Sequence, residues 1–107
     1  MIKAYNKLVR DRIPEIIEAS GVICKTQQLS NELYLKMIDA KLDEELAEYH
    51  KEQNIEELAD LLEVVYAATI ARGYTIEELE AVRTEKVEKR GGFQNKIFLL
   101  ETIENNK

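Results

Sequence analysis

Apolar residues recur along most of this chain at intervals of three and four, which is the spacing of one face of an α-helix. The clearest stripe lies between residues 31 and 50 and consists of Tyr34, Leu35, Ile38, Leu42, Leu46 and Tyr49. Ser30 or Asn31 can cap the start of this segment, because a short polar side chain accepts a hydrogen bond from the first turn. The pattern therefore predicts an amphipathic helix over residues 31–50.

Three further segments carry helical start and stop signals. Pro14 stands where the first turn of a helix would begin, and Gly21 follows the end of that segment. Asn54 and Thr75 are each followed three residues later by a glutamate, which is the pattern of a capping box. The helices predicted from these signals cover residues 12–20, 55–72 and 76–90.

The segments between the predicted helices are short. Residues 22–29 are compatible with an extended conformation, so we expect an extended connection there. After Gly92 we expect a short extended segment with a frayed tail. Brief turns between successive helices favour antiparallel packing. The chain is therefore expected to be an all-α, antiparallel bundle of about four helices, forming a single domain over residues 1–107. A domain this short buries a modest core, so we expect oligomerisation to complete the bundle.

The third predicted helix places carboxylates among apolar residues. Residues 58–71 read LADLLEVVYAATIA, a sequence apolar on every face that predicts a helix buried all round. Glu57, Asp60 and Glu63 recur at steps of three and therefore follow one stripe of this helix. A buried carboxylate is costly unless it is paired or bound to a cation. This helix offers no basic residue before Arg72, so compensation from elsewhere is expected.

The second predicted helix adds further carboxylates. Glu45 and Glu48 are three residues apart, and the turn that follows them is short. In an antiparallel pair of helices, Glu48 falls at the height of Glu57, and Glu45 at that of Asp60 one turn further on. If the two acidic stripes face each other, these four carboxylates converge between the helices.

Such a cluster repels itself unless it is protonated or holds a hard cation. Ligands that are all oxygen suit Mg²⁺, or Mn²⁺, rather than zinc or copper. A di-iron site would need Glu-x-x-His pairs, and the only histidine, His50, has no glutamate three residues before it. A second interpretation remains open, a solvated hairpin in which Glu44 and Glu48 face water and pair with Lys41 and Lys51. The apolar surroundings of Asp60 in the sequence favour the metal.

Basic residues for binding phosphate occur in two places. Arg83, Lys86 and Arg90 are spaced three and four apart and share one face of the fourth predicted helix. Lys7 and Arg10 add positive charge near the N-terminus. The alternative is that these cations balance the helix dipole or are ordinary surface charges.

Composition narrows the classes of partner. The chain is 45% hydrophobic and 34% charged, and its net charge of −6 argues against a protein that coats a nucleic acid polymer. No stretch approaches the roughly 20 apolar residues that span a bilayer, and no apolar segment follows the basic N-terminus as it would in a signal peptide. A single cysteine, Cys24, fits a reducing compartment. We therefore expect a soluble, cytoplasmic domain that does not bind membranes.

Two motifs resemble a known superfamily. EELAE (44–48) followed by EELAD (56–60) is similar to the E-x-x-E and E-x-x-D signature of the all-α nucleotide pyrophosphohydrolases, which include MazG, the dimeric dUTPases and phosphoribosyl-ATP pyrophosphohydrolase. KLVRDRIPEII (7–17) and RTEKVEKRGGF (83–93) resemble small stand-alone members described as house-cleaning pyrophosphohydrolases. The segment between the two acidic motifs, residues 49–56, is shorter than in many members.

The resemblance implies roles for particular residues. The Mg²⁺ ligands, and hence the catalytic residues, would be Glu45, Glu48, Glu57 and Asp60. Lys86 and Arg90 match cations that hold phosphates in MazG proteins. Arg83, Lys7 and Arg10 are further candidates for binding the substrate, and Glu44 or Glu63 could orient a ligand or a water molecule.

The expected activity is Mg²⁺-dependent hydrolysis of the α–β phosphoanhydride of a nucleoside triphosphate or related nucleotide, including damaged or modified ones, to a monophosphate and pyrophosphate. Family members form dimers or tetramers, so a homodimer or homotetramer is expected. The alternative is a non-catalytic helical interaction module with an acidic, Mg²⁺-binding face. The base and sugar of the substrate do not follow from the sequence.

Overall fold

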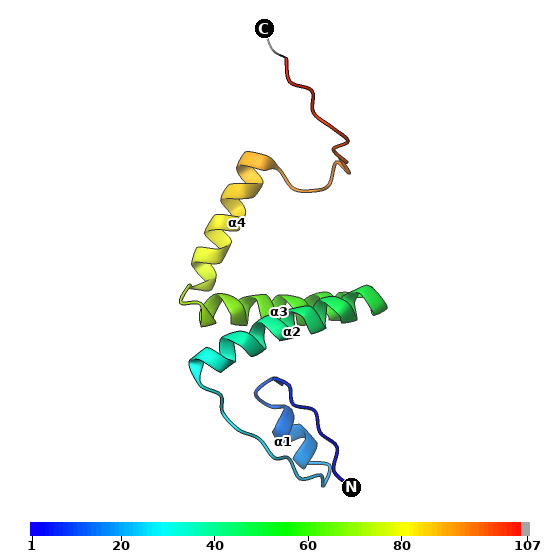
Figure 1. Cartoon of the computed structure of the whole chain (residues 1–107), viewed down its shortest axis with the longest axis vertical. Coiled ribbons are helices and arrows are strands. Elements are labelled where there is room, and N and C mark those ends of the chain that lie inside the picture. Colours follow the sequence, from blue (N-terminus) through cyan, green and yellow to red (C-terminus); the bar gives the residue numbers. More distant parts are fainter. Residues whose placement is uncertain (106–107) are drawn as a thin grey trace. The chain divides into compact units, whose positions relative to one another are not determined.

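The computed structural model describes residues 1–105, and within them the chain is all-α, with four helices and no strand (Figure 1). The helices are α1 (Ile13–Glu18), α2 (Asn31–Glu52), α3 (Ile55–Ala71) and α4 (Ile76–Arg90). Each predicted helix is present, and each end lies within two residues of its predicted position. The chain divides into two compact units, Met1–Ile76 and Glu77–Lys107.

The helix starts follow from local hydrogen bonding. The Ser30 hydroxyl accepts a hydrogen bond from the backbone N–H of Leu33 (3.2 Å) at the start of α2. The Asn54 side chain accepts one from the backbone N–H of Glu57 (2.9 Å) at the start of α3. Pro14 occupies the first turn of α1, where its missing N–H has no helical partner to lose. These contacts confirm the capping residues expected for α2 and α3.

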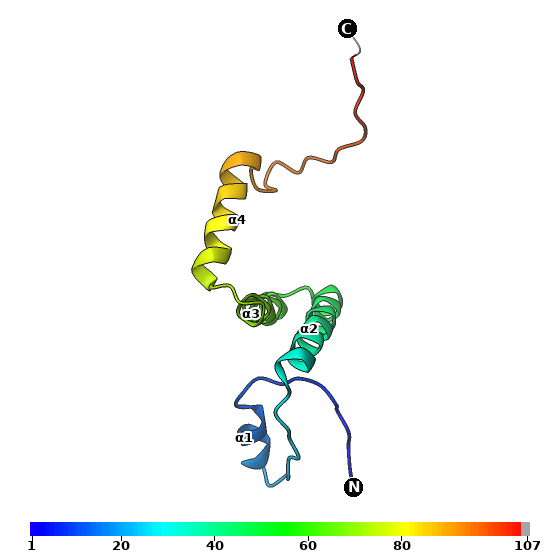
Figure 2. The same cartoon turned by 60° about the vertical axis from the view of Figure 1, so that its left-hand side comes forward.

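In the first unit, α2 and α3 are the helices that pack against each other (Figure 2). Gln53 and Asn54 join them, and Gln53 adopts a left-handed conformation (φ 52°) that ends α2. Among residues 1–105, the buried hydrophobic side chains are Ile38 of α2 and Val64 of α3. The core of this unit therefore lies between the two helices that carry the acidic motifs.

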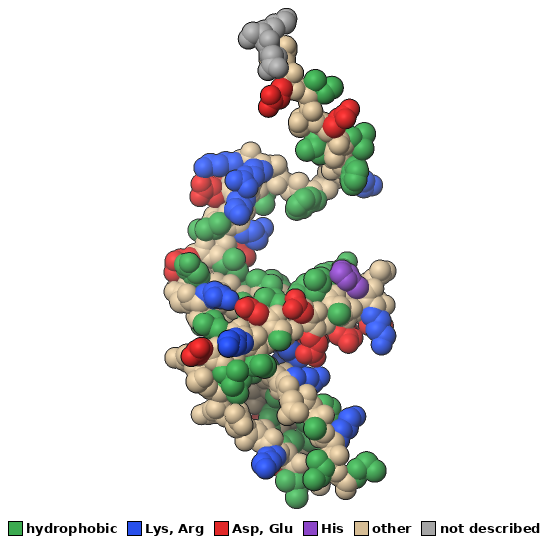
Figure 3. Space-filling model, in the orientation of Figure 1, with side chains coloured by type: hydrophobic (Ala, Val, Ile, Leu, Met, Phe, Trp, Pro, Cys, Tyr) green, Lys and Arg blue, Asp and Glu red, His purple; other side chains and the backbone are tan. Residues whose placement is uncertain are grey.

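Within the first unit, α3 is not buried all round as the sequence predicts. Leu58 and Leu62 of α3 are 44% and 48% exposed, and Leu46, from the predicted stripe of α2, is 42% exposed. The reason is geometric: in the first unit one helix packs against α3 and covers one of its faces. Hydrophobic side chains are accordingly visible among the charged ones on the face drawn in Figure 3.

The second unit consists of most of α4 and the segment that follows it. No residue of α4 is buried. Gly91 has a positive φ of 81°, and residues 91–105 contain no helix or strand, as the sequence predicted. Four consecutive apolar residues in this segment, residues 97–100, are exposed.

None of the helices within residues 1–105 combines the length and the apolar character that a membrane span requires.

Candidate metal centre

Three carboxylates meet across the α2–α3 pair. Glu45 comes from α2, and Glu57 and Asp60 come from α3. Each offers an oxygen atom, and these atoms all lie within 4.8 Å of one another. The three side chains come from two helices, so packing of α2 on α3 creates the cluster.

The local sequence explains this placement. Asn54 caps α3 through the N–H of Glu57, which sets Glu57 in the first turn of the helix. Asp60 follows three residues later, on the same face. The left-handed residue Gln53 reverses the chain within a short turn, so the last part of α2 lies beside the first part of α3. Glu45 is thereby brought to the two acids of α3.

Glu48 does not join this cluster. Its side chain is exposed, and among the described residues the group of carboxylates that meet contains Glu45, Glu57 and Asp60. Its charge still acts on the cluster, because it helps to raise the pKa of Glu57. Glu63, the third acid of the predicted stripe, is exposed. The structure therefore brings together three of the four predicted ligands.

Basic side chains already contact two members of the cluster. An Arg10 guanidinium nitrogen lies 2.7 Å from an oxygen of Asp60, and both side chains are about half exposed. Lys41 Nζ lies 3.5 Å from Glu45, one helical turn away on α2, and both of these side chains are largely shielded from solvent. The sequence predicts that a group outside α3 compensates the charge of its carboxylates, and for Asp60 this group is Arg10. No charged residue among residues 1–105 is fully buried, so each carboxylate of the cluster keeps some contact with solvent.

A second pair of contacts lies beside the cluster. Glu44 accepts hydrogen bonds from Lys7 and from Lys41, each at 3.3 Å. The solvated hairpin predicted as the alternative is therefore realised in part: Glu44 pairs with Lys41, as that alternative has it, and with Lys7 in addition. Partial burial would raise the pKa of Glu44, but the hydrogen bonds and charges of these two lysines lower it below 4.5.

Glu57 has the opposite environment. Partial loss of solvent raises the pKa of Glu57 above 4.5, and the charges of Asp60, Glu48, Glu45 and Glu52 raise it further. Within residues 1–105 no ion pair neutralises the Glu57 carboxylate, whereas Asp60 and Glu45 each have a cation nearby. Glu57 is therefore the member of the cluster on which repulsion between carboxylates is most evident.

The donor set fits a hard divalent cation. All three groups are carboxylates, and Mg²⁺ prefers oxygen ligands and retains several water molecules when it is bound by few protein groups. An excess of negative charge around Glu57 would be relieved by such an ion. The residues that could hold it are Glu45, Glu57 and Asp60, with Glu48 close enough to contribute to the local field.

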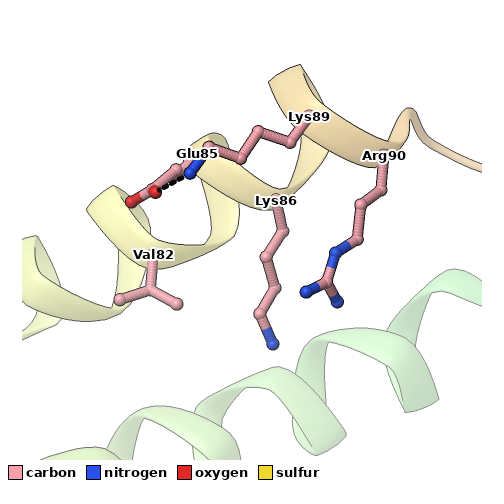
Figure 4. A pocket seen from close by; sticks show the side chains of 5 residues that line it. All are labelled: Val82, Glu85, Lys86, Lys89 and Arg90. Carbon is pink, nitrogen blue, oxygen red and sulfur yellow. Dashed lines mark hydrogen bonds and ion pairs between the residues drawn. The ribbon is translucent and has the colours of Figure 1, made fainter.

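Two of the three basic residues predicted to share a face of the fourth helix do so. Lys86 and Arg90 extend from the same side of α4 and line a shallow hollow with Val82 (Figure 4). Arg83 pairs with Glu80 (2.8 Å), as Lys89 does with Glu85 (2.7 Å). Because α4 belongs mainly to the second unit, a role for its cations at the carboxylate cluster stays a prediction.

Sequence reasoning missed the cations that contact the cluster. Lys41 stands four residues before Glu45, a spacing that places both on one side of a helix, so this pair was recognisable. Arg10 stands 50 residues before Asp60 in a segment without helical periodicity. The sequence predicts a phosphate-binding role for Arg10 and contains no signal that links it to Asp60.

Comparison with known proteins does not assign this chain to a family. No protein-family model matches the chain, and no solved structure matches it. A stretch of 42 residues is 57% identical to an uncharacterized protein of Mycolicibacterium smegmatis (strain ATCC 700084 / mc(2)155). The match covers 39% of this chain and 43% of that protein, so the chain spans less than half of the relative's length.

Proposed function

We propose that this protein is a nucleotide pyrophosphohydrolase of the MazG type, which uses Mg²⁺ to hydrolyse the α–β phosphoanhydride of a nucleoside triphosphate or related nucleotide. The products would be a monophosphate and pyrophosphate. The observation that carries the proposal is the meeting of Glu45, Glu57 and Asp60 within 4.8 Å across two helices. Each of these residues belongs to one of the two acidic motifs on which the resemblance rests.

The metal would be held by Glu45, Glu57 and Asp60. Glu48, one helical turn from Glu45 on α2, would complete the set by a change of side-chain rotamer. When bound, Mg²⁺ supplies positive charge for the phosphate oxygens and for the developing charge of the reaction. Mn²⁺ has the same ligand preferences and is expected to substitute.

Basic side chains would bind the remaining phosphate charge. Lys86 and Arg90 lie on one face of α4 (Figure 4), and neither forms an ion pair within residues 1–105, so both can approach an anion. Arg83, Lys7 and Arg10 are further candidates, although each contacts a carboxylate in this structure. Their existing pairs would have to break first.

The proposal includes assembly of two or more copies. Leu58 and Leu62 of α3 and Leu46 of α2 are exposed hydrophobic residues on the helices that hold the metal ligands. Covering such side chains removes apolar area from water, which favours association. A homodimer or homotetramer would extend the small core between α2 and α3.

One observation favours a second function. The acidic face of the α2–α3 pair already contacts three basic side chains, Lys7, Arg10 and Lys41. A face of this kind could dock a basic segment of another protein and bind Mg²⁺ without turnover. The second candidate is therefore a non-catalytic helical interaction module.

Metal-dependent release of pyrophosphate separates the two functions. Purified protein is incubated with a panel of nucleoside triphosphates, normal and oxidised, with Mg²⁺, with Mn²⁺ or with EDTA, and the products are identified by chromatography. We expect a monophosphate and pyrophosphate in the presence of either metal and none with EDTA. A panel that yields no pyrophosphate with either metal would exclude the enzyme and leave the interaction module.

A further inference from the structure

The N-terminal segment contacts the acidic face of the α2–α3 pair at two points. Lys7 Nζ lies 3.3 Å from Glu44 and an Arg10 nitrogen lies 2.7 Å from Asp60. These contacts join residues that are 37 and 50 positions apart in the sequence. The segment therefore presents cations to the face that holds the carboxylate cluster.

The Arg10 contact engages a cluster member itself. Asp60 is one of the three residues whose oxygens meet, and Arg10 donates a hydrogen bond to one of its oxygens. A divalent cation bound to Asp60 would place positive charge beside the guanidinium. Since like charges repel, the guanidinium and the metal compete for the same carboxylate.

The contact is of a kind that can be displaced. The side chains of Arg10 and Asp60 are 57% and 42% exposed, and an exposed ion pair of this sort contributes little to stability. Residues 1–10 form no helix or strand, so the backbone that carries Arg10 is not held in regular structure. Lys41 differs on both counts: it belongs to α2, and its side chain is only 16% exposed.

We propose that Arg10 is an exchangeable counter-ion of the metal centre, which neutralises Asp60 until a divalent cation displaces it and then binds a phosphate of the substrate. The inference rests on the proposed function, because it takes the carboxylate cluster as the metal site. It assigns an order to binding: metal first, then nucleotide. A guanidinium released beside the metal is well suited to phosphate, which it binds through two parallel hydrogen bonds.

The first test measures the metal alone. Calorimetric titration with Mn²⁺ compares wild type with Arg10→Gln, which lacks the competing cation. We expect Mn²⁺ to bind roughly two- to fivefold more tightly to Arg10→Gln, the gain that corresponds to loss of one exposed ion pair. Arg12→Gln is the matched control, because it removes the same charge from the same segment but breaks a contact with Glu15. Its affinity for Mn²⁺ should equal that of wild type.

The second test measures phosphate binding. Titration of the Mn²⁺-loaded proteins with inorganic pyrophosphate should show weaker binding to Arg10→Gln than to wild type or Arg12→Gln. Opposite changes in one variant, tighter metal and weaker pyrophosphate, are the signature of exchange. An arginine that merely anchors the N-terminal segment would leave Mn²⁺ affinity unchanged or lower it.

A measurement on the wild-type protein covers the case in which Arg10→Gln does not fold. The side-chain Nε–H resonance of Arg10 should shift in NMR spectra as Mg²⁺ is added, while that of Arg12 stays in place. No shift at Mg²⁺ saturation would overturn the inference.

The outcomes separate the two proposals. If wild type binds Mn²⁺ and Arg10→Gln binds it no more tightly, the exchange is wrong and the metal site stands. If neither protein binds Mn²⁺, the metal site and the exchange both fail. If Arg10→Gln alone binds measurably, the competition is stronger than expected and the inference is supported.

Discussion

Within the carboxylate cluster, Glu57 is the residue whose ionised form is most disfavoured by its surroundings. Its pKa is raised by partial loss of solvent and then by the charges of neighbouring acids, Asp60 foremost among them. A folded-state pKa above the ordinary 4.5 means that ionised Glu57 is less favourable in the folded than in the unfolded chain. This cost is fully present at pH values above the raised pKa and is relieved as the pH falls through it towards 4.5. A bound cation would remove this cost, because its positive charge favours the ionised carboxylate.

Glu57→Gln is therefore predicted to stabilise the metal-free protein. The control is Glu56→Gln, because Glu56 also lies in the first turn of α3 and both substitutions remove a charge that favours the helix dipole. Urea unfolding in EDTA at pH 7 should show Glu57→Gln to be more stable than Glu56→Gln. The difference should shrink as the pH is lowered through the raised pKa. Equal stabilities at pH 7 would mean that repulsion at Glu57 is negligible.

Asp60→Asn tests the metal site without a large cost to the fold. The exposed pair with Arg10 that it removes contributes about 0–1 kcal/mol, and loss of one charge from the cluster offsets part of that. Thermal melts of wild type should shift upwards with Mg²⁺, because a ligand that binds only the folded state stabilises it. The shift in Asp60→Asn should be much smaller.

The control for that measurement is Asp39→Asn. Asp39 forms an exposed ion pair with Arg72 (3.0 Å) and is not a member of the cluster, so the substitution removes an equivalent pair elsewhere on the α2–α3 hairpin. Asp39→Asn should keep the full Mg²⁺-dependent shift. If Asp60→Asn keeps it too, the metal binds elsewhere.

At the scale of elements, the hairpin of α2 and α3 depends on how each helix begins. Asn54 caps α3 at the N–H of Glu57, so the residue that starts the helix also positions a proposed metal ligand. Ser30 caps α2 in the same way at Leu33, far along the helix from Glu45. The two caps have similar local roles and differ in their distance from the cluster.

Asn54→Ala and Ser30→Ala form a matched pair. Each is predicted to lower the free energy of unfolding by about 1 kcal/mol, since each leaves a first-turn N–H without its side-chain acceptor. Only Asn54→Ala should also weaken Mn²⁺ binding, because fraying of the first turn of α3 moves Glu57. Unfolding in urea and calorimetry with Mn²⁺ measure the two effects. Equal Mn²⁺ affinities in both variants would show that the cap does not position the ligand.

At the scale of the molecule, the described hydrophobic core is small. Ile38 and Val64 are the buried hydrophobic residues among residues 1–105, while Leu58 and Leu62 of α3 are nearly half exposed. So small a core contributes little free energy to folding, so covering more apolar area would stabilise the chain. Contact with another copy would cover the exposed face of α3, and a two-fold dimer is the simplest symmetric arrangement.

Sedimentation equilibrium at micromolar concentration tests this prediction. We expect a mass of at least twice the 12.4 kDa of the chain. Leu62→Lys, which places a charge on the exposed apolar face of α3, should shift the equilibrium towards monomer. The control is Lys36→Glu, an exposed charge reversal on α2. Wild-type protein that sediments as a monomer would contradict the association.

Much of the fold was predictable because its signals are local. Helix bounds follow from polar caps and from glycines, whose effects act within four residues. The acidic stripes were predictable for the same reason, since the spacing of Glu57 and Asp60 places them on one face. The exposure of α3 was not predictable from periodicity. An apolar helix sequence indicates that the helix can pack against other apolar surfaces, but it does not identify the segment or partner that supplies them.

The sequence by itself determined the four helices, their ends, and the side of each helix on which the carboxylates lie, because each depends on residues a turn or less apart. The tertiary structure alone decided which carboxylates meet and which cations neutralise them. Glu48 turns to solvent while Glu45 joins the acids of α3, and Arg10 reaches Asp60 across 50 residues of chain. Such contacts depend on side-chain rotamers and on the path of an irregular segment. Neither of these leaves a periodic pattern in the sequence from which it could be predicted.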